Sequence, residues 1–407
     1  MPKTILPRTD QAQFGTSGSQ NALLSQLAKT GRMPPVQLVI KPLDNSGNVV
    51  LDRFLSYQFS SSMLIPVDTF TFNFAAPDGP PLNDVIKEGD IISLSANNVQ
   101  LATGLIDQTE VETDAEFGEK AVITGRDLMG QLEDQDSISL DSKPLYANQL
   151  SVRNGVRALL GDTRITNIFV RNAPSSNYLL ATEPGEKKLS SLQRFLEPLN
   201  CLAWMGPSGE IIIGKPNFEQ AAKGTIILNK SRRQSNVLSM RCTRAAAQIA
   251  NIIVPVWSGQ ETVTDRVGPQ QRLYNAAPGP QRLFKLGHRL PQTVVVSAPN
   301  ATDAQGLSDI NALKAGGSNL LQSYAKREMA RQNQRELIVQ AVVPGHFNDL
   351  GEPFIVDTIY RVNYDRGSVD ENMYLFQVDY VLDESGGQKT NLYFCRLGTI
   401  VSDVKAP

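Results

Sequence analysis

The sequence predicts a mixed β and α/β fold, in which two similar β-rich regions flank a small α/β domain. Short alternating strands separated by turn residues fill residues 36–135. A helical stripe and a strand pair occupy residues 136–224. Alternating strands return in residues 225–407, together with a Gly/Pro/Arg-rich loop at 258–291 and a helical insert at about 303–332. Short strands with this spacing are typical of sandwiches and barrels.

Composition sets limits on the function. The chain has 407 residues, of which 41% are hydrophobic and 20% charged, with a net charge of −2. These values are ordinary for a soluble globular protein and do not mark the whole surface as a nucleic-acid binder. No apolar run approaches the roughly 18 residues of a membrane-spanning helix, and no signal peptide is visible. We therefore expect a protein that is made in the cytoplasm and is kept or assembled there.

Residues 1–35 are rich in Gly, Ser, Gln and Asn and poor in large apolar groups. Such a segment cannot form a core of its own. We expect an extended N-terminal arm that docks on a neighbouring chain.

The first β-rich region begins at Val36. Phe70, Phe72 and Phe74 alternate with polar residues, which is the period of a half-buried strand. Gly89-Asp90 precedes a strand at Ile91–Ser95, and Asn97-Asn98 turns into a strand at Val99–Ile106. Six or seven strands are expected before residue 127.

An acidic strand comes next, with all its carboxylates on one side. A second strand, Lys120–Thr124, lies after it and leads into Gly125-Arg126-Asp127. Like charges about 7 Å apart repel by about 0.6 kcal/mol per neighbouring pair. The row is either a solvated strand face or is retained for a reason other than stability. Its members are Glu110, Glu112, Asp114 and Glu116.

The same row is the one candidate acid/base site. Its spacing falls within the carboxylate separation of inverting glycosidases. A glycosidase also needs a cleft, a pocket that raises a carboxyl pKa, and aromatic residues that stack on sugars. Only Phe117 lies close by. We therefore predict no catalytic residues and no enzyme activity.

The middle domain is predicted from helical periodicity. Leu150–Leu160 is expected to be a helix, and Ser190 to Gln193 has the spacing of a capping box. Two strands, Cys201–Trp204 and Glu210–Gly214, are joined by a Gly-Pro-Ser-Gly turn. The apolar stripe of the second helix consists of Leu189, Leu192, Phe195 and Leu199.

The second β-rich region contains the basic loop 258–291. A long loop inside a compact domain is usually functional. We expect it to contact a partner protein; phosphate binding is the weaker alternative, because few aromatics interleave its charges. The helical insert is clearest at Ser318–Arg331. The candidate partner-contact residues in the loop are Arg266, Arg272, Arg282 and Lys285.

A faint internal echo relates the two β-rich regions. Lys87–Ile92 and Asp349–Val356 each lead into paired strands. Chance is the alternative explanation, since the residue match is weak.

No cofactor or metal site is predicted. The chain has no glycine-rich nucleotide motif and no H-E-x-x-H. Its three cysteines, Cys201, Cys242 and Cys395, stand far apart, which argues against a zinc site or a disulfide framework. His288 and His346 are expected to be ordinary loop or strand residues.

Three segments resemble contractile-tail phage baseplate hub proteins, the phage Mu tail protein P-like group, which are related to hub domains of type VI secretion. In Gly104–Asp134 a strand pair leads into Gly125-Arg126-Asp127 and then Leu132 and Asp134. Leu189–Pro216 resembles the middle domain of that group, with a helix, an aromatic strand and a Gly turn. The closing strands at 354–397 resemble its second barrel.

The resemblance implies two tube-type β-barrel domains around the α/β domain and a homotrimeric hub in the virion tail baseplate. Three chains then present six barrels that adapt a sixfold tail tube to a threefold central spike. The implied partners are the tail tube or a tube-initiator protein, a separate spike protein, the tape-measure protein and baseplate wedge proteins. DNA passes only in transit, and Glu110, Glu112, Asp114 and Glu116 are expected to line its channel.

Two other functions remain open from the residues. The chain is alternatively a virion adhesin or carbohydrate-binding β-module, or a tail enzyme that cleaves peptidoglycan. Mass in solution separates the hub from the adhesin, and a cell-wall zymogram tests the enzyme.

Overall fold

β-Strands dominate the computed structural model, and helices are few. This agrees with the predicted class. Residues 1–34 of the predicted arm and the whole insert at 303–332 lie outside the described part of the chain. The described residues are 35–43, 47–52, 54–76, 86–114, 118–137, 146–173, 178–183, 185–196, 199, 201–229, 235–244, 252–257, 272–273, 277–278, 293–297, 337–383 and 387–400.

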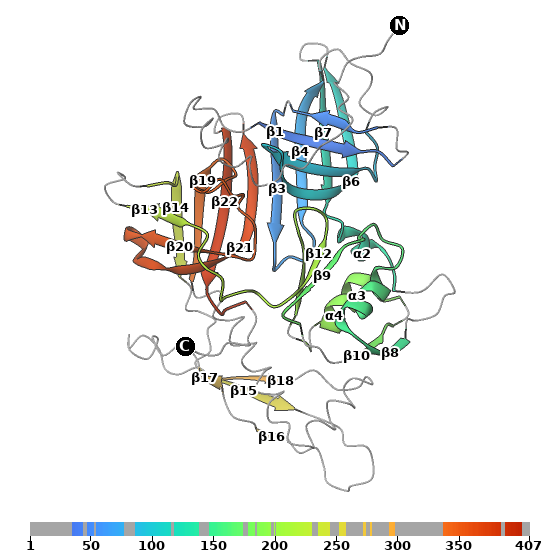
Figure 1. Ribbon diagram of the computed structural model, residues 1–407, viewed down its shortest axis with the longest axis vertical. Helices are drawn as coiled ribbons and strands as arrows, with labels where there is room; N and C mark the ends of the chain where they lie inside the picture. Colours follow the sequence, from blue (N-terminus) through green and yellow to red (C-terminus); the bar gives the residue numbers. More distant parts are fainter. Residues whose placement is uncertain are drawn as a thin grey trace.

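The first β-rich region forms one antiparallel run of strands in the order β3-β4-β7-β6-β5-β1-β2 (Figure 1). Phe70, Phe72 and Phe74 are all buried on β4, as the alternation predicts. The strands are β1 (Val36–Lys41), β2 (Val49–Leu51), β3 (Ser56–Ser62), β4 (Thr69–Ala76), β5 (Ile91–Ala96), β6 (Val99–Asp114) and β7 (Gly118–Arg126).

The acidic strand differs from the prediction, because it is not a separate element. It continues from Val99 as the single 16-residue strand β6. The register against β7 shifts between Ile106 and Gln108, which makes Asp107 a β-bulge. One extra residue moves the alternation by one position, so that Ile106 and Val111 both face the core. Read without the bulge, the sequence suggests two strands.

The middle of the chain is a small α/β unit around its own hydrophobic cluster. Leu192, Phe195 and Leu199 are buried in it, as predicted. The predicted capping box is wrong, because the helix begins at Lys188 and therefore contains Ser190. The elements are α2 (Gly130–Asp134), β8 (Tyr146–Leu150), α3 (Val152–Leu160), β9 (Ile168–Arg171), β10 (Tyr178–Ala181), α4 (Lys188–Leu196), β11 (Leu202–Met205) and β12 (Ile211–Gly214).

The second β-rich region adds strands to the same large sheet. Its strands are β13 (Thr225–Leu228), β14 (Ser239–Arg244), β19 (Leu337–Pro344), β20 (Thr358–Tyr364), β21 (Val369–Asp383) and β22 (Gly387–Arg396), with the 3-10 turn η3 (Asp365–Gly367) between β20 and β21.

A separate small sheet lies between β14 and β19 in the sequence. It joins β15 (Ile252–Trp257) with β16 (Arg272–Leu273), β17 (Ala277–Pro278) and β18 (Thr293–Ser297). The predicted loop 258–291 is therefore not structureless throughout, because β16 and β17 fall inside it and pair with β15.

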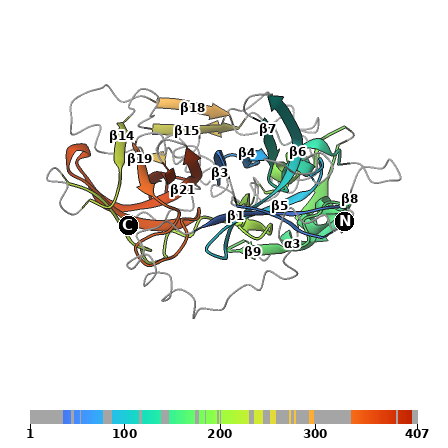
Figure 2. The ribbon, with the colours of Figure 1, turned by 90° about the horizontal axis from the view of Figure 1, so that it is seen from above.

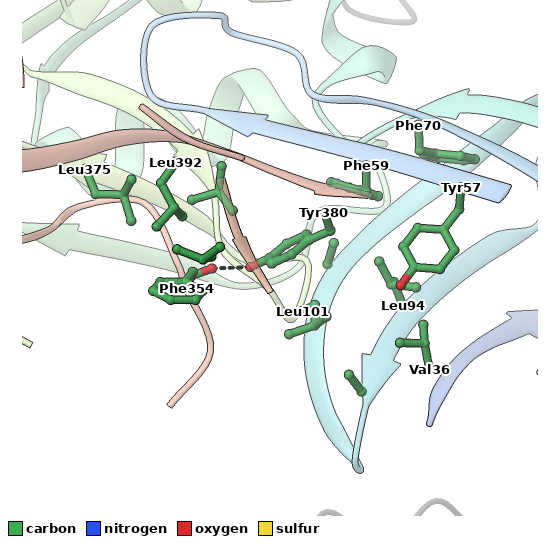
Figure 3. Close-up of a cluster of buried hydrophobic side chains, with 14 of the residues drawn as sticks. Val36, Tyr57, Phe59, Phe70, Leu94, Leu101, Phe354, Leu375, Tyr380 and Leu392 are labelled. Atoms are coloured by element: carbon green, nitrogen blue, oxygen red, sulfur yellow. Dashed lines mark hydrogen bonds between the residues drawn. The ribbon is translucent and has the colours of Figure 1, made fainter. Parts of the chain in front are cut away.

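The two β-rich regions meet where β3 pairs with β21. Figures 1 and 2 show the regions side by side, with these strands between them. Their cores are continuous at this junction. In Figure 3, Phe59 of β3 and Tyr380 of β21 lie in one buried cluster, and the Tyr380 hydroxyl donates to the Phe354 carbonyl oxygen. Pairing of strands far apart in sequence thus makes one 13-stranded sheet.

The same strand order occurs twice. The order β3-β4-β7-β6-β5 in the first region matches β14-β19-β22-β21-β20 in the second. The strand pairings also match residue by residue. Adding the same number to each residue of the first region gives its counterpart in the second, so that Leu105 corresponds to Tyr374, Gly118 to Gly387 and Thr69 to Ile338. The register shift on β21, between Leu375 and Gln377, falls at the position equivalent to the bulge on β6.

A backbone hydrogen bond is also repeated. Gly89 and Asp357 both have positive φ just before β5 and β20. Gly89 N donates to Ile106 O over 2.8 Å, and Asp357 N donates to the equivalent Leu375 O over 3.0 Å. The weak echo in the sequence thus falls beside a repeated backbone arrangement. Its first copy, 87–92, contains Gly89, whereas its second copy, 349–356, ends one residue before the equivalent Asp357.

Candidate functional site

The predicted carboxylate row begins on the exposed face of β6. Glu110 and Glu112 are exposed, whereas Val111 between them is half-buried and packs against the main core. Strand alternation therefore places both carboxylates on the face away from the core, as predicted. Asp114 is the last residue of β6, and its side chain lies outside the described part of the chain, as does Glu116.

Lys120 on the neighbouring strand lowers the cost of this row. In the β6·β7 ladder Lys120 is directly opposite Glu112, and it is exposed on the same face. Opposite charges at such positions stabilise a sheet by about 0.2–1 kcal/mol. This stabilisation is of the same size as the repulsion of about 0.6 kcal/mol expected between neighbouring carboxylates. The sequence pattern alone did not include this cross-strand partner.

Arg126, at the end of β7, ties the sheet to the α/β unit. Its guanidinium donates to Asp107 on the β6 bulge at 2.7 Å and to Asp134 of α2 at 2.7 Å, with Glu133 at 3.2 Å. These bonds to Asp107 and Asp134 raise the Arg126 pKa above its ordinary value. The Gly125-Arg126-Asp127 segment is thus the exit from a strand, as predicted, and Arg126 holds α2 against that strand end.

Two buried carboxyl groups lie beside this exit. Asp127 Oδ1 accepts from Met129 N at 2.9 Å, while Asp127 Oδ2 is buried without a partner. Burial raises the Asp127 pKa to about 7. Burial, then the charge of Asp127, raises the Asp68 pKa well above its usual range. Sequence reasoning missed this pair, because only the β4·β7 register brings Asp68 and Asp127 to the same end of the sheet.

A cavity of about 210 Å³ lies where the two β-rich regions and the α/β unit meet. The Arg171 guanidinium of β9 binds the Asp357 carboxylate and stands 5.3 Å from the centre of the Trp204 ring. Tyr374 donates its hydroxyl to Asp357 Oδ1, and Asn217 N donates to the same oxygen at 3.0 Å. The residues that surround the cavity include Asp68, Leu101, Arg171, Trp204, Asp357 and Tyr380.

These contacts make Asp357 a structural clamp. Its side chain is 4% exposed and receives three donors, two of them from the α/β unit and its connection. A buried carboxylate held by a guanidinium and two further hydrogen bonds is well compensated. The arrangement holds the α/β unit and the second β-rich region together.

The described part of the chain contains one histidine, and its side chain does not reach the solvent. His346 is buried between Tyr57 Oη, at 2.6 Å, and Thr390 Oγ1, at 2.8 Å, and burial lowers its pKa to about 3. It lies in the bend after β19, a loop position as predicted, and its ring is buried in the core. No group of three or more His, Cys, Asp or Glu side chains in the described part of the chain can hold a metal ion.

The predicted basic loop is only partly described. Arg272 begins β16 and is opposite Trp257 of β15, but its side chain is not described. Arg266, Arg282 and Lys285 lie outside the described residues. A partner contact there stays a prediction.

Solved structures with the same fold are phage tail and secretion proteins. A tail protein from Neisseria meningitidis MC58 superposes with a TM-score of 0.70 at 17% identity, covering 90% of this chain and 98% of its own. A 43 kDa tail protein of prophage MuSo2 from Shewanella oneidensis gives a TM-score of 0.68 at 15% identity, covering 89% and 99%.

The chain has the fold of these phage tail proteins. A third structure is an E. coli protein that is a component of the type VI secretion system and resembles the T4 bacteriophage tail proteins gp27 and gp5. It matches with a TM-score of 0.50 at 8% identity, covering 87% of this chain and 76% of its own. The resemblance noted in the sequence is thus confirmed at the level of the fold. No protein-family model and no curated protein sequence matches the chain. Among the described helices, none is both long and apolar enough to cross a membrane.

Proposed function

We propose that the chain is the structural hub of a contractile phage tail baseplate. Three copies form a ring that adapts the sixfold tail tube to the threefold central spike and encloses the channel for DNA ejection. The hub belongs to the virion and is assembled in the host cytoplasm. It is a structural protein that binds the tube or its initiator, the spike, the tape-measure protein and baseplate wedge proteins.

The observation that carries this proposal is the repeated strand order. A chain that contains two β-rich units of the same order and register supplies six such units as a trimer, which suits a sixfold partner. The fold match over 98% and 99% of two tail proteins supports a role in the tail. We infer that the two units are the two tube-type barrels.

The carboxylate row has a role in this assembly. Glu110, Glu112, Asp114 and Glu116 line the channel, where negative side chains repel phosphates and keep DNA from binding. The exposed positions of Glu110 and Glu112 support this. The basic loop with Arg266, Arg272, Arg282 and Lys285, and the arm at 1–35, contact the neighbouring baseplate proteins.

Solution mass and electron microscopy test the hub. In analytical ultracentrifugation we expect the mass of three chains for the protein alone, or of three chains plus the bound partner after a tube or spike protein is added. Electron microscopy should show a ring with Glu110 and Glu112 on its inner wall. A monomer under all these conditions contradicts the hub. A ring with these carboxylates on its outer surface contradicts only the channel-lining role. Clearing of cell-wall material in a zymogram contradicts the non-enzymatic assignment.

A further inference from the structure

Two strands of the large sheet have an edge that no other described strand pairs with. Within the described residues, β14 is hydrogen-bonded only to β19, and β6 beyond its bulge only to β7. Figure 1 shows β14 and β6 on opposite sides of the molecule. An open edge presents unpaired backbone N–H and C=O groups and is a ready template for another strand.

The chain already contains one junction of this kind. β3 is antiparallel to β21, with Phe59 opposite Tyr380 and Gln58 opposite Val381. Phe59 and Tyr380 are both buried, so this ladder joins the cores of the two β-rich regions as well as their backbones.

The internal repeat relates the free edges to that junction. In the repeated order β14 takes the place of β3, and β6 takes the place of β21. Following the ladders residue by residue, Cys242 is equivalent to Phe59. Val111 is equivalent to Tyr380 in the same way. The junction therefore predicts both the direction and the register in which the free edges fit together.

We propose that β14 of one copy pairs antiparallel with β6 of a second copy, with Cys242 opposite Val111 and Arg241 opposite Glu112. The partner is another copy of this chain, and the inference rests on the proposed ring. This pairing places the free edge of β6, the strand that carries Glu110 and Glu112, at the subunit interface.

The side chains on the core side suit this pairing. Val111 and Cys242 are each half-buried, and each already packs against the main core of its own region. Placed opposite one another, they continue that core across the subunit boundary, as Phe59 and Tyr380 do within the chain. Removing the remaining exposed surface of these two apolar side chains from water favours association.

The side chains on the other face decide which edges meet. Glu112 is exposed on β6, and Arg241 is exposed on β14. The proposed register sets these opposite charges side by side, with Glu110 opposite Thr243. Pairing two β6 edges gathers carboxylates, and pairing two β14 edges brings together the Arg241 side chains of two copies. Like charges opposite each other destabilise a sheet, so head-to-tail contacts are preferred. Head-to-tail contacts are those that close a ring.

A disulfide test uses the native Cys242. Val111→Cys sets two thiols opposite each other across the proposed interface, within the Cα separation that a disulfide needs. Under mild oxidation we expect covalent dimers and trimers on a non-reducing gel, and their loss when Cys242→Ser is added. Thr113→Cys, two residues out of register on the same strand, is the matched control and should cross-link at least tenfold less. The remaining cysteines, Cys201 and Cys395, are buried.

A charge swap gives a second readout. Glu112→Arg should weaken self-association at least tenfold, and Arg241→Glu in the same chain should restore it. Thermal melting shows that each variant is folded. A trimer that forms without a Cys242-dependent cross-link, or a swap that restores nothing, overturns the β6·β14 pairing and leaves the hub intact. A wild-type chain that stays monomeric both alone and with a tube or spike protein added overturns the hub itself.

Discussion

At the scale of single residues, the buried acids are the least expected feature. Asp127 is 1% exposed and Asp68 is 6% exposed, with Asp379 nearby at 4%. Burial raises the pKa of Asp127 to about 7. Its unfolded pKa is near 3.9. The folded state therefore binds the Asp127 proton more tightly than the unfolded state does. The stability that this provides is present below about pH 4 and is lost as the pH rises through about 7.

Asp127→Asn should reduce this pH dependence. The amide keeps an acceptor for Met129 N and cannot ionise. We expect little change in the free energy of unfolding at pH 4 and a gain of about 1–3 kcal/mol at pH 9, where the wild-type carboxyl must ionise or hold its proton while buried and the amide need do neither. Urea denaturation at the two pH values measures it. Asp370→Asn, at an exposed carboxylate, is the control and should show no such difference. A loss of stability at pH 9 contradicts the assignment.

At the scale of elements, strands β4, β6 and β7 pack unusually closely. The Phe70 ring fills the space over Gly104 and Gly125, so that a Cβ on either glycine falls 2.4 Å from a ring carbon. At Gly125 the Cβ also falls 2.1 Å from the Leu105 carbonyl oxygen, which is backbone and cannot turn aside. These glycines allow Phe70 to lie flat within the first core.

Gly125→Ala should therefore destabilise the first β-rich region. Overpacking of a filled core typically costs about 1–3 kcal/mol. Gly224→Ala is the matched control, because its Cβ meets nothing closer than a Tyr360 ring carbon at 3.5 Å. Urea unfolding of the two variants gives the comparison. Equal stabilities mean that the strands can separate to admit a methyl group.

The elements were predictable wherever one face is buried. Burial forces a period of two on Phe70, Phe72 and Phe74 and a helical period on Leu192 and Phe195, so local patterns sufficed. The start of α4 was misplaced, because buried Lys188 begins that helix and donates its ammonium protons to Asp162 and to Gln135. Those partners are distant in sequence and leave no capping signal.

At the scale of the whole molecule, Asp357 holds the α/β unit against the second β-rich region. Asp357→Ala leaves Arg171, Tyr374 and Asn217 N without their shared acceptor. We expect a loss of about 1–3 kcal/mol. Hydrogen exchange should rise in β9 and β11 before it rises in β4. Asp370→Ala, which removes only exposed contacts with Arg361 and Asn363, should stay within about 0.5 kcal/mol of the wild type. Uniform exchange changes across all strands contradict the clamp.

This clamp could not be predicted from the sequence. Arg171 and Asp357 are 186 positions apart, and neither stands in a recognisable motif. The exposed face of Glu110 and Glu112 was predictable, since alternation alone defines it. The Lys120 partner of Glu112 required the hairpin register. Local patterns thus defined faces, and long-range pairing defined the partners that those faces meet.

The β3·β21 junction also affects how a ring of several copies would assemble. Its two strands are tethered in one chain, so that this ladder forms at a high effective concentration and without loss of translational freedom. In a ring of three copies, half of the six junctions are complete before any two molecules meet. Three junctions then remain, and two molecular encounters followed by closure of the ring complete them. The yield of a ring built from three chains depends on a lower power of the protein concentration than the yield of a ring built from six separate units. The three-chain ring can therefore form at a lower protein concentration.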